Sequence, residues 1–315
     1  MFLMRRVILP LLALSLLALP SAASAGPRVG VSDQLASTFA NPLYAPLHLT
    51  MARYITPWDV MSRAGDRAQL AAWVAAAQLA HQRILIAFEV SHTRGHQRKL
   101  PSKATYTKAI ARFHRAYPQI KEIQPWNEVN RQQHSAGGGY LVGQPTWRNP
   151  KMAAVYYMAA RKVFRGDRVT GLDILDQANV KPAVKYIKQF LRYAHPRPKY
   201  WGFHNYSDTN RFSSKRTKAL LKATRSGEVW LTETGGIVRL GNSFPYNTRR
   251  AAKALGCMFT IAKSSRRIKR LYIYQFNGVA KGGGGAFDAG LLNANQTARP
   301  GYNVVKHRKA GRCHK

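Results

Sequence analysis

The chain has 315 residues, 45% of them hydrophobic, and it carries 50 Lys and Arg against 13 Asp and Glu, so that its formal net charge is +37. This length and apolar content suffice to bury one large core, and two cysteines are too few for a small disulfide-rich scaffold. So large a positive charge favours anionic polymers as partners. The sequence holds no zinc-finger spacing, RNP-like aromatic motif or basic heptad region, and we therefore expect no specific nucleic-acid recognition.

Residues 1–25 have the three parts of an export signal. Arg5 and Arg6 come first, an apolar run follows from Val7 to Leu19, and Ala23-Ser24-Ala25 gives a small-residue cleavage site. The apolar run is shorter than the ~20 residues that span a bilayer, so we expect no transmembrane segment. The expected product is a secreted monomer that begins near Gly26, and loss of the two arginines lowers its formal charge from +37 to +35.

Residues 26–315 contain no Pro/Ser-rich linker, and we treat them as a single domain in which strand-like and helical runs alternate. Eight strands are predicted, at Arg28–Ser32, Leu49–Thr56, Ile84–Ser91, Ile120–Trp126, Val169–Leu175, Tyr200–Asn205, Val229–Thr232 and Arg270–Phe276. Helical spacing occupies 66–83, 103–118, 150–164, 181–195, 215–225 and 247–263, and a closing helix is expected within 299–311. Residues 33–48 are poorly periodic and predict only a short or distorted helix.

This alternation is typical of the α/β class and of a (β/α)8 TIM barrel in particular. A doubly wound open sheet would need a Gly-rich phosphate turn after its first strand, where this chain reads VGVSDQ. A barrel concentrates its chemistry at the carboxyl ends of its strands. Two carboxylates stand there in a chain that is poor in acids: Glu128 after the fourth predicted strand and Glu233 after the seventh.

The pair, in the contexts WNEVN and VWLTETGG, resembles clan A of the glycoside hydrolases. The segment GFHNYSD and the ending FDAGLLNANQTARPGYNVV are similar to that clan as well. The resemblance implies a retaining glycosidase that acts on a β-linked glycan, with Glu128 as acid/base and Glu233 as nucleophile. It also implies that Asn127 binds the sugar 2-hydroxyl, that Arg53 and Tyr206 hold Glu233 ionised, and that His204 lines the same wall.

Two positions depart from the clan's pattern. Val129 stands where many members have Pro, and Gln275 with Phe276 stands where many have Trp, which puts the platform for the reacting sugar in doubt. We therefore consider Gln275 and four aromatic residues as candidate sugar contacts: Trp58, Trp126, Trp201 and Tyr274. The negative charge of Glu233 is expected to raise the pKa of Glu128, so that Glu128 holds a proton.

Weaker candidates remain at the strand ends. Glu89, Asp173 and Asp176 either pair with surplus arginines or line outer subsites, and His92 and His96 have a spacing seen in metal sites but no third ligand. We therefore expect neither a metal nor another cofactor. Cys257 and Cys313 either remain free thiols or form a bridge that ties the C-terminal tail to the seventh helix.

Two functions stay open on the sequence alone. One is a secreted glycoside hydrolase acting on a polysaccharide or oligosaccharide, and the other is an inactive basic barrel that binds carbohydrate or cell wall. Most of the positive charge falls on the predicted helices, which form the outer ring of a barrel. We expect this charge to tether the protein to anionic envelope polymers while the cleft acts on a mostly neutral glycan; the alternative is an acidic substrate bound by basic groups within the cleft.

Overall fold

A computed structural model of the chain describes residues 26–132, 134–136, 139–141, 143–279 and 287–314. The expected export signal, residues 1–25, lies outside these ranges. Among the residues described, no helix is both long enough and apolar enough to cross a bilayer.

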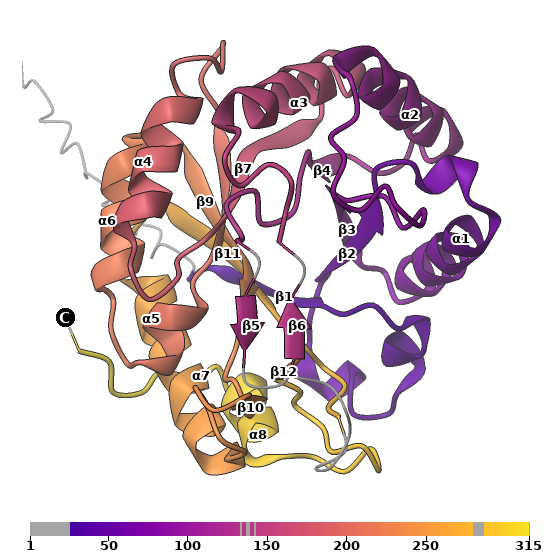
Figure 1. Ribbon diagram of the computed structural model, residues 1–315. Helices are drawn as coiled ribbons and strands as arrows, with labels where there is room; N and C mark the ends of the chain where they lie inside the picture. The colour runs from indigo at the N-terminus through magenta and orange to yellow at the C-terminus, as the bar shows by residue number, and fades with distance from the viewer. Residues whose placement is uncertain (1–25, 133, 137–138, 142, 280–286, 315) are drawn as a thin grey trace, which may run out of the picture.

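Eight parallel strands close into a barrel in the order β1-β11-β9-β8-β7-β4-β3-β2, which confirms the predicted TIM barrel (Figure 1). They are β1 (Arg28–Ser32), β2 (Met51–Pro57), β3 (Arg83–Glu89), β4 (Glu122–Gln124), β7 (Arg168–Leu175), β8 (Tyr200–His204), β9 (Glu228–Thr234) and β11 (Ile268–Ile273). All eight predicted strands are present. The fourth is shorter than expected, because β4 keeps ladder pairing only at its first two residues with β7 and its last two with β3.

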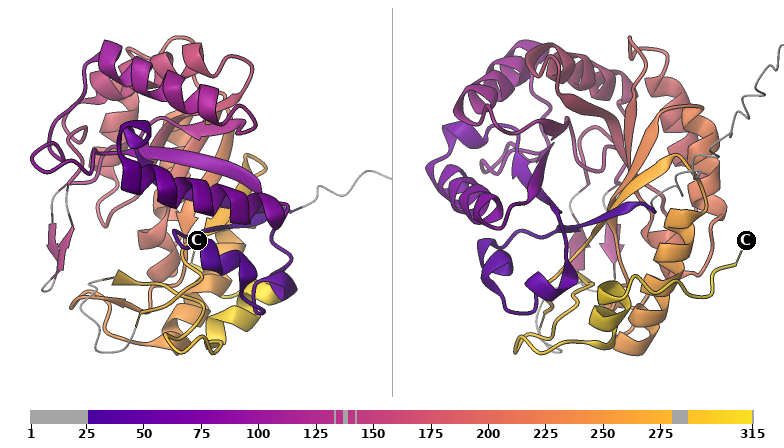
Figure 2. Two further views of the ribbon diagram at one scale, coloured as in Figure 1. Left: turned by 90° about the vertical axis from the view of Figure 1, so that its right-hand side faces the viewer. Right: turned by 180° about the vertical axis from the view of Figure 1, so that it is seen from behind.

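Helices surround the barrel, as both views in Figure 2 show. They are α1 (Ala64–Leu79), α2 (Lys103–Ala116), α3 (Pro150–Val163), α4 (Lys181–Phe190), α5 (Tyr206–Asn210), α6 (Lys215–Thr224), α7 (Thr248–Lys263) and α8 (Pro300–Lys306). The poorly periodic first connection holds two short 3-10 helices, η1 (Ala36–Ala40) and η2 (Ala45–Leu47), and a third, η3 (Val60–Ser62), follows β2. Two small antiparallel pairs add to the loops: β5 (His134–Ala136) with β6 (Gly139–Leu141), and β10 (Arg239–Leu240) with β12 (Phe287–Asp288).

The helices begin where the sequence supplies caps. Ser102 accepts a hydrogen bond from Thr105 N at the start of α2, and Asn247 accepts one from Arg250 N at the start of α7. Asn149 does the same for α3, with Pro150 at the first helical position, where a missing N–H costs nothing. Each helix then buries one face against the strands, which leaves the loops at the strand ends free to carry the site.

The amino end of the barrel is closed by a buried charge cluster rather than by apolar side chains alone. Glu122 on β4 pairs with Arg270 on β11 at 2.5 Å across the interior, and both side chains are 1% exposed. The Arg270 guanidinium also lies 4.0 Å from the centre of the Trp230 ring. This plug fixes the strands at one end, and the opposite end bears the site.

The C-terminal tail is fastened to α7. Cys257 and Cys313 form a disulfide bond with a sulfur–sulfur distance of 2.07 Å, which settles the open alternative in favour of the bridge. Next to it, Gly311 N donates to Gly256 O at 2.9 Å. The tail thus packs backbone against backbone on a helix of the outer ring.

Candidate active site

A cleft of about 1190 Å³ opens at the carboxyl ends of the strands. Its lining includes five of the predicted site residues: Asn127, Glu128, Tyr206, Glu233 and Tyr274. Asn127 and Glu128 come from the loop after β4, Glu233 from β9, and Tyr206 from the start of α5. Segments far apart in the sequence therefore meet in one hollow, as the TIM barrel predicts.

Glu128 sits on a constrained turn. Its backbone φ is 43°, in the left-handed region that non-glycine residues seldom adopt. Two backbone hydrogen bonds hold the turn, from Val129 N to Asp173 O at 3.0 Å and from Arg131 N to Glu128 O at 2.9 Å. The turn aims the carboxylate back over the barrel axis, where it is only 6% exposed.

Glu233 is held by a cation and a phenol. Arg53 Nη1 lies 2.6 Å from Glu233 Oε1, and the Tyr206 hydroxyl donates to Oε2 at 3.3 Å. These are the two partners that the resemblance assigns to this carboxylate. Both contacts fix the position of the carboxylate at the edge of the cleft, as a nucleophile requires.

Arg53 uses all its donors in the barrel interior. Beyond Glu233 it donates to Asn127 Oδ1 at 2.8 Å and to Asp173 Oδ2 at 2.8 Å, and it also bonds Gln124 and Ser32. The side chain is fully buried and contacts no part of the cleft. Arg53 is therefore a positioning residue for Glu233 and Asn127, and the structure does not place it against a substrate.

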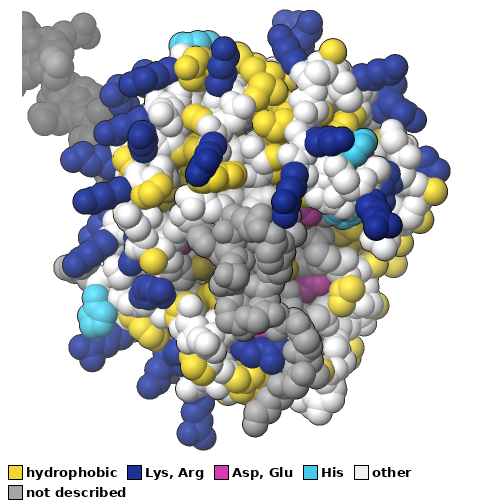
Figure 3. Space-filling model, viewed as in Figure 1, with side chains coloured by type: hydrophobic (Ala, Val, Ile, Leu, Met, Phe, Trp, Pro, Cys, Tyr) yellow, Lys and Arg dark blue, Asp and Glu magenta, His cyan; other side chains and the backbone are white. Residues whose placement is uncertain are grey.

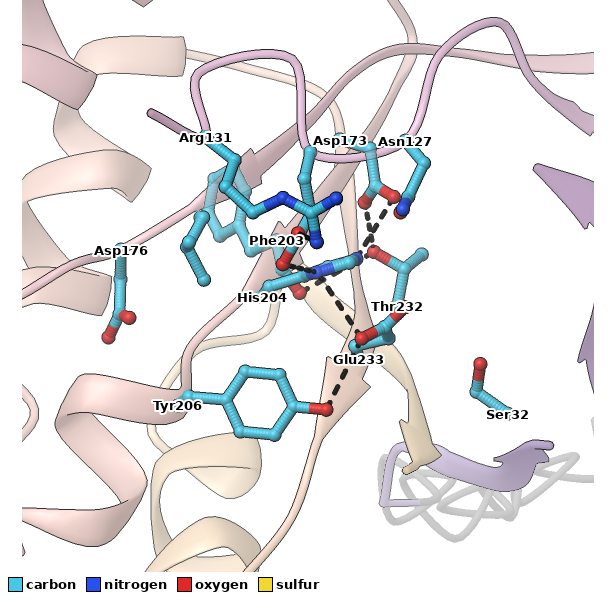
Figure 4. A network of polar contacts seen from close by, with 12 residues as sticks. Ser32, Asn127, Arg131, Asp173, Asp176, Phe203, His204, Tyr206, Thr232 and Glu233 are labelled. Atoms are coloured by element: carbon cyan, nitrogen blue, oxygen red, sulfur yellow. Dashed lines mark hydrogen bonds and ion pairs between the residues drawn. The ribbon is translucent and has the colours of Figure 1, made fainter. Parts of the chain in front are cut away.

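His204 lies beneath both carboxylates. Its Nδ1 is 2.9 Å from Glu128 Oε1 and 3.6 Å from Glu233 Oε2, and its Nε2 is 2.9 Å from Asp173 Oδ2 (Figure 4). Burial opposes protonation, but the surrounding carboxylates, Asp173 first, raise the pKa of His204 to about 10. The ring is fully buried, so the expectation that it lines the substrate wall is wrong: it is a cation under the site.

The two carboxylates are close enough to act on one bond. One oxygen of Glu128, one of Glu233 and a ring nitrogen of His204 all lie within 4.8 Å of one another. Retaining glycosidases hold their two carboxyl groups ~5 to 5.5 Å apart, whereas inverting enzymes leave room for water at ~6.5 to 9.5 Å. The spacing here fits the retaining arrangement.

The protonation state of Glu128 differs from the prediction. Burial raises its pKa, but Arg131, whose Nη1 lies 2.6 Å from Oε2, and His204 together lower the pKa to about 2. The expectation that Glu233 lifts this pKa is therefore wrong for the unliganded site. The cause is that two cations contact Glu128 directly, and they outweigh the more distant carboxylate.

The same three residues could in principle offer ligands to a cation, since Glu128, His204 and Glu233 converge. Their ligand atoms are already engaged, however. Arginines contact both carboxylates at 2.6 Å, and His204 bridges two acids as an imidazolium. Such a donor set favours an uncharged or anionic guest over a divalent ion.

Several predicted sugar contacts lie outside the cleft. Trp126 is 2% exposed, stacks on Tyr156 at 5.0 Å and donates to Gln144, so it belongs to the core beneath α3. Trp201 packs on Phe190 in the same way, and the half-buried Trp58 packs against the core. Gln275 donates to Asn277 O at 2.7 Å and does not line the cleft. A position at a strand end does not decide which side of the barrel wall a side chain faces, and these residues face outward or into the loops.

Three aromatic residues line the cleft and could contact a sugar in place of these tryptophans. Phe287 lies 5.6 Å from Tyr206 and 5.9 Å from Tyr274, ring centre to ring centre, and all three rings line the cleft. Together they give the aromatic surface on which a pyranose could stack. Phe287 falls in the segment that resembles the clan's ending. Its position after the last strand is the sequence feature that could have identified it as a sugar contact.

Two charged site residues were undervalued or missed. Asp173 on β7 holds both Arg53 and His204, although its sequence context distinguished it no more than that of Glu89. Arg131 was not among the predicted site residues. The sequence feature that could have indicated it is its position three residues after Glu128, where a cation can pair with the carboxylate. Glu89 lines the cleft and, with Asp66, raises the pKa of His92 to about 9, so this histidine is an ion-pair partner on the rim.

The fold is similar to that of several glycoside hydrolases. Xylanase 10B of Thermotoga maritima matches with a TM-score of 0.63 at 14% identity, over 90% of this chain and 95% of the xylanase. A family 39 glycoside hydrolase of Bacteroides cellulosilyticus gives 0.56 at 16% identity over 90% and 64% of the two chains. GH5_18 of Streptomyces cattleya, solved with GlcNAc, gives 0.61 at 15% identity over 90% and 79%.

No protein-family model and no curated protein matches the sequence. Identities this low show the fold alone. The chain therefore has the TIM-barrel fold of the clan A glycoside hydrolases, and its chemistry has to be argued from the site.

Proposed function

We propose that the protein is a retaining glycoside hydrolase that cleaves a β-linked glycan by double displacement. The observation that carries the proposal is the pair Glu128 and Glu233, which face one cleft with oxygens within 4.8 Å. Glu233 attacks the anomeric carbon and Glu128 protonates the departing oxygen; water then enters with Glu128 as base. We also propose that the protein is secreted and works as a monomer without a metal or cofactor.

Neighbouring groups support these roles. Arg53 and Tyr206 hold the Glu233 carboxylate in place, and Asn127, fixed by Arg53 and lining the cleft, is positioned to bond the sugar 2-hydroxyl. Tyr206, Tyr274 and Phe287 offer the aromatic surface. Xylobiose and GlcNAc occur in complexes of proteins with this fold, and a related small sugar is the class of ligand we assign to the cleft.

The first test separates nucleophile from acid/base. Glu233→Ala should lower turnover on every substrate by about three orders of magnitude or more, because no glycosyl ester can form. Glu128→Ala should lose least on dinitrophenyl glycosides, whose leaving group needs no proton, and added azide should restore turnover as a glycosyl azide of retained configuration. Early proton NMR should show the substrate's own anomer in the product.

Glu233→Gln serves as the control for folding, since it keeps the shape of the side chain; it should melt near the wild type and remain inactive. Inverted product, or wild-type rates in both alanine variants, would exclude a double displacement by this pair.

A carbohydrate-binding barrel without hydrolysis is the second candidate, and one observation favours it. In the unliganded site Arg131 Nη1 and His204 Nδ1 both contact Glu128, at 2.6 Å and 2.9 Å, and these cations hold its pKa well below the usual range, which opposes the protonated form that an acid needs. On this alternative, calorimetry would find glycans that bind wild type and Glu233→Ala equally, and neither protein would release reducing ends.

A further inference from the structure

Arg131 occupies a place that the double displacement does not require. Its Nη1 lies 2.6 Å from Oε2 of Glu128, and the side chain is 20% exposed and lines the cleft. Its Nε is buried and has no hydrogen-bond partner within the part of the chain that the structure describes. The side chain therefore lines the substrate space, while its unpartnered Nε lies buried behind that surface.

The two oxygens of Glu128 face different sides of the site. Oε1 contacts His204 Nδ1 at 2.9 Å, and that nitrogen is 3.6 Å from Glu233. The other oxygen, Oε2, contacts Arg131 Nη1. Since the acid/base lies between the nucleophile and the departing sugar, we infer that Arg131 stands on the leaving-group side.

Three cations and four carboxylates meet around the acid/base position. Glu128 is faced by Arg131 from its own loop, His204 from β8, Glu233 from β9, Asp173 from β7 and Arg53 from β2. With His204 protonated, the three cations balance Glu128, Glu233 and Asp173, and Glu89 at the end of β3 is a further carboxylate that acts on Arg131. Of these cations only Arg131 lines the cleft, so it is the one that a ligand can engage.

Engaging Arg131 would change what Glu128 can do. While Arg131 and His204 both hold it, Glu128 stays ionised and cannot protonate a leaving group. An anionic group on the substrate would draw the guanidinium away and add negative charge beside Glu128, and both changes favour proton uptake. A carboxylate suits this role, because guanidinium donors match its two oxygens in a planar fork.

Resting on the glycosidase function proposed above, we propose that the natural substrate carries a uronic acid on the leaving-group side of the scissile bond, whose carboxylate binds Arg131 and releases Glu128 to act as acid. This departs from the mostly neutral glycan expected from the sequence. Arg211 also lines the cleft, but it lies 5.1 Å from the Phe244 ring and is no part of the site proposed for this carboxylate.

The cycle balances without an added reactant. Glu128 takes a proton from water once the uronate has bound Arg131. Glu233 attacks C1, the C1–O electron pair stays on the departing oxygen, and that oxygen takes the proton of Glu128. Water then attacks C1, gives one proton to Glu128 and releases Glu233 as a carboxylate. When the products leave and Arg131 pairs with Glu128 again, Glu128 returns its proton to the solvent, which restores the starting state; nothing is oxidised or reduced.

The test compares β-linked uronic-acid polysaccharides with their carboxyl-reduced forms, which keep the linkage and lose only the charge. Reducing-end release by wild type should favour the acidic form by about tenfold or more in kcat/KM. Arg131→Gln should bring the ratio close to one. Arg211→Gln is the matched control, since it removes the same charge from the same cleft beside Phe244, and it should keep most of the preference.

A binding measurement guards against loss of activity for other reasons. In the inactive Glu233→Gln background, calorimetry with uronate oligosaccharides should show weaker binding after Arg131→Gln, while the carboxyl-reduced oligosaccharides bind alike. Equal ratios in wild type and Arg131→Gln, or a wild-type preference for the reduced polymer, would overturn the inference. So would Arg131-dependent cleavage confined to sulfated or phosphorylated glycans.

Dinitrophenyl glycosides distinguish this failure from failure of the proposed function. If Glu233-dependent turnover of some aryl glycoside is found but the uronate preference is not, only the role of Arg131 is wrong. If no aryl glycoside or polymer shows Glu233-dependent turnover, the glycosidase and the inference fall together.

Discussion

His204 carries its positive charge where a neutral imidazole would leave three carboxylates short of a counterion. The burial of the ring opposes this charge, and the charges of Asp173 and Glu233 together with the bonds to Asp173 and Glu128 outweigh it, raising the pKa from 6.5 to about 10. Arg53 and Arg131 supply the remaining positive charge. The site is thus a six-charge network in which the histidine stays protonated at neutral pH and loses its charge only as pH approaches about 10.

This predicts a pH dependence of stability. A group whose folded-state pKa is raised contributes stability that is complete below its unfolded pKa and is lost as pH rises through the folded value. Urea unfolding of wild type should therefore show a free energy that falls, by at least about 1 kcal/mol, as pH rises from 6.5 to about 10. His204→Asn should be less stable at pH 6.5 and lose a large part of this slope; His92, whose pKa is raised to about 9 but whose side chain is 45% exposed, supplies a smaller part.

The exposed His96 supplies the control, because His96→Asn should keep the wild-type slope. A slope that survives His204→Asn unchanged would mean that other groups cause it.

Residue identity at a strand end was enough to select Glu128 and Glu233, because an acid-poor chain places them where a barrel concentrates its chemistry. It was not enough to give the pKa of Glu128. That depends on the left-handed turn at Glu128, which returns the chain so that Arg131 meets its carboxylate. Trp126 shows the same limit, since one residue of register decides between cleft and core.

At the scale of elements, β8 needs a residue without a side chain. A Cβ on Gly202 would lie 2.5 Å from Asp173 Oδ1, 2.6 Å from Gln124 Nε2 and 2.9 Å from Thr232 Oγ1. These groups belong to the polar layer that holds Arg53 and His204 under the carboxylates. The missing side chain at Gly202 thus leaves space for the polar groups that hold Arg53 and His204.

Gly202→Ala should destabilise the protein by about 1–3 kcal/mol, because the methyl group displaces well-packed polar atoms. Activity should fall as well, since Asp173 cannot move without releasing Arg53 and His204. Gly65→Ala is the matched control: a Cβ there meets nothing within 4 Å, and the change at this exposed helical position should be neutral or slightly stabilising. The measurements are the urea unfolding midpoint and kcat/KM of both variants. A Gly202→Ala protein with the stability and activity of wild type would contradict the packing argument.

The elements themselves were the most predictable part of the molecule. Apolar and helical patterns predicted all eight barrel strands, because most of their residues are apolar and buried, and they correctly left residues 33–48 without a regular helix. The short pairs β5–β6 and β10–β12 were not foreseen. Their two or three residues are too few to show a pattern. The β5–β6 pair lies within the loop after β4, and the β10–β12 pair joins the loops after β9 and β11.

At the scale of the whole molecule, the charge is far larger than one site needs. Exposed Lys and Arg recur along the outer helices: Lys103, Lys108, Arg112 and Arg115 on α2, Lys181, Lys185 and Lys188 on α4, and Lys215, Lys218 and Lys222 on α6. Figure 3 shows Lys and Arg side chains spread around the edge of the view, with Asp and Glu visible only nearer its middle. The outer ring thus carries a positive field that is separate from the balanced charges under the cleft.

We propose that this field holds the protein on anionic envelope or matrix polymers, as the sequence led us to expect. Attraction between exposed charges is screened beyond ~8 Å at 0.15 M salt and beyond ~3 Å at 1 M, whereas pairs buried under the site are screened much less. Raising salt to about 1 M should therefore release wild type from isolated cell walls. It should leave kcat/KM on a small uncharged aryl glycoside nearly unchanged, because that substrate needs only the cleft.

Replacing Lys181, Lys185 and Lys188 on α4 together by Glu provides a salt-independent version of the same test. These side chains are exposed, so the triple variant should fold normally, bind walls more weakly at 0.15 M salt and keep the wild-type rate on the aryl glycoside. Arg131→Gln should do the reverse for polymers: it should keep wall binding and lose the preference for uronates. If the α4 variant and wild type bind walls alike at every salt concentration, the outer charge does not tether the protein, and the affinity for anionic polymers has to arise within the cleft.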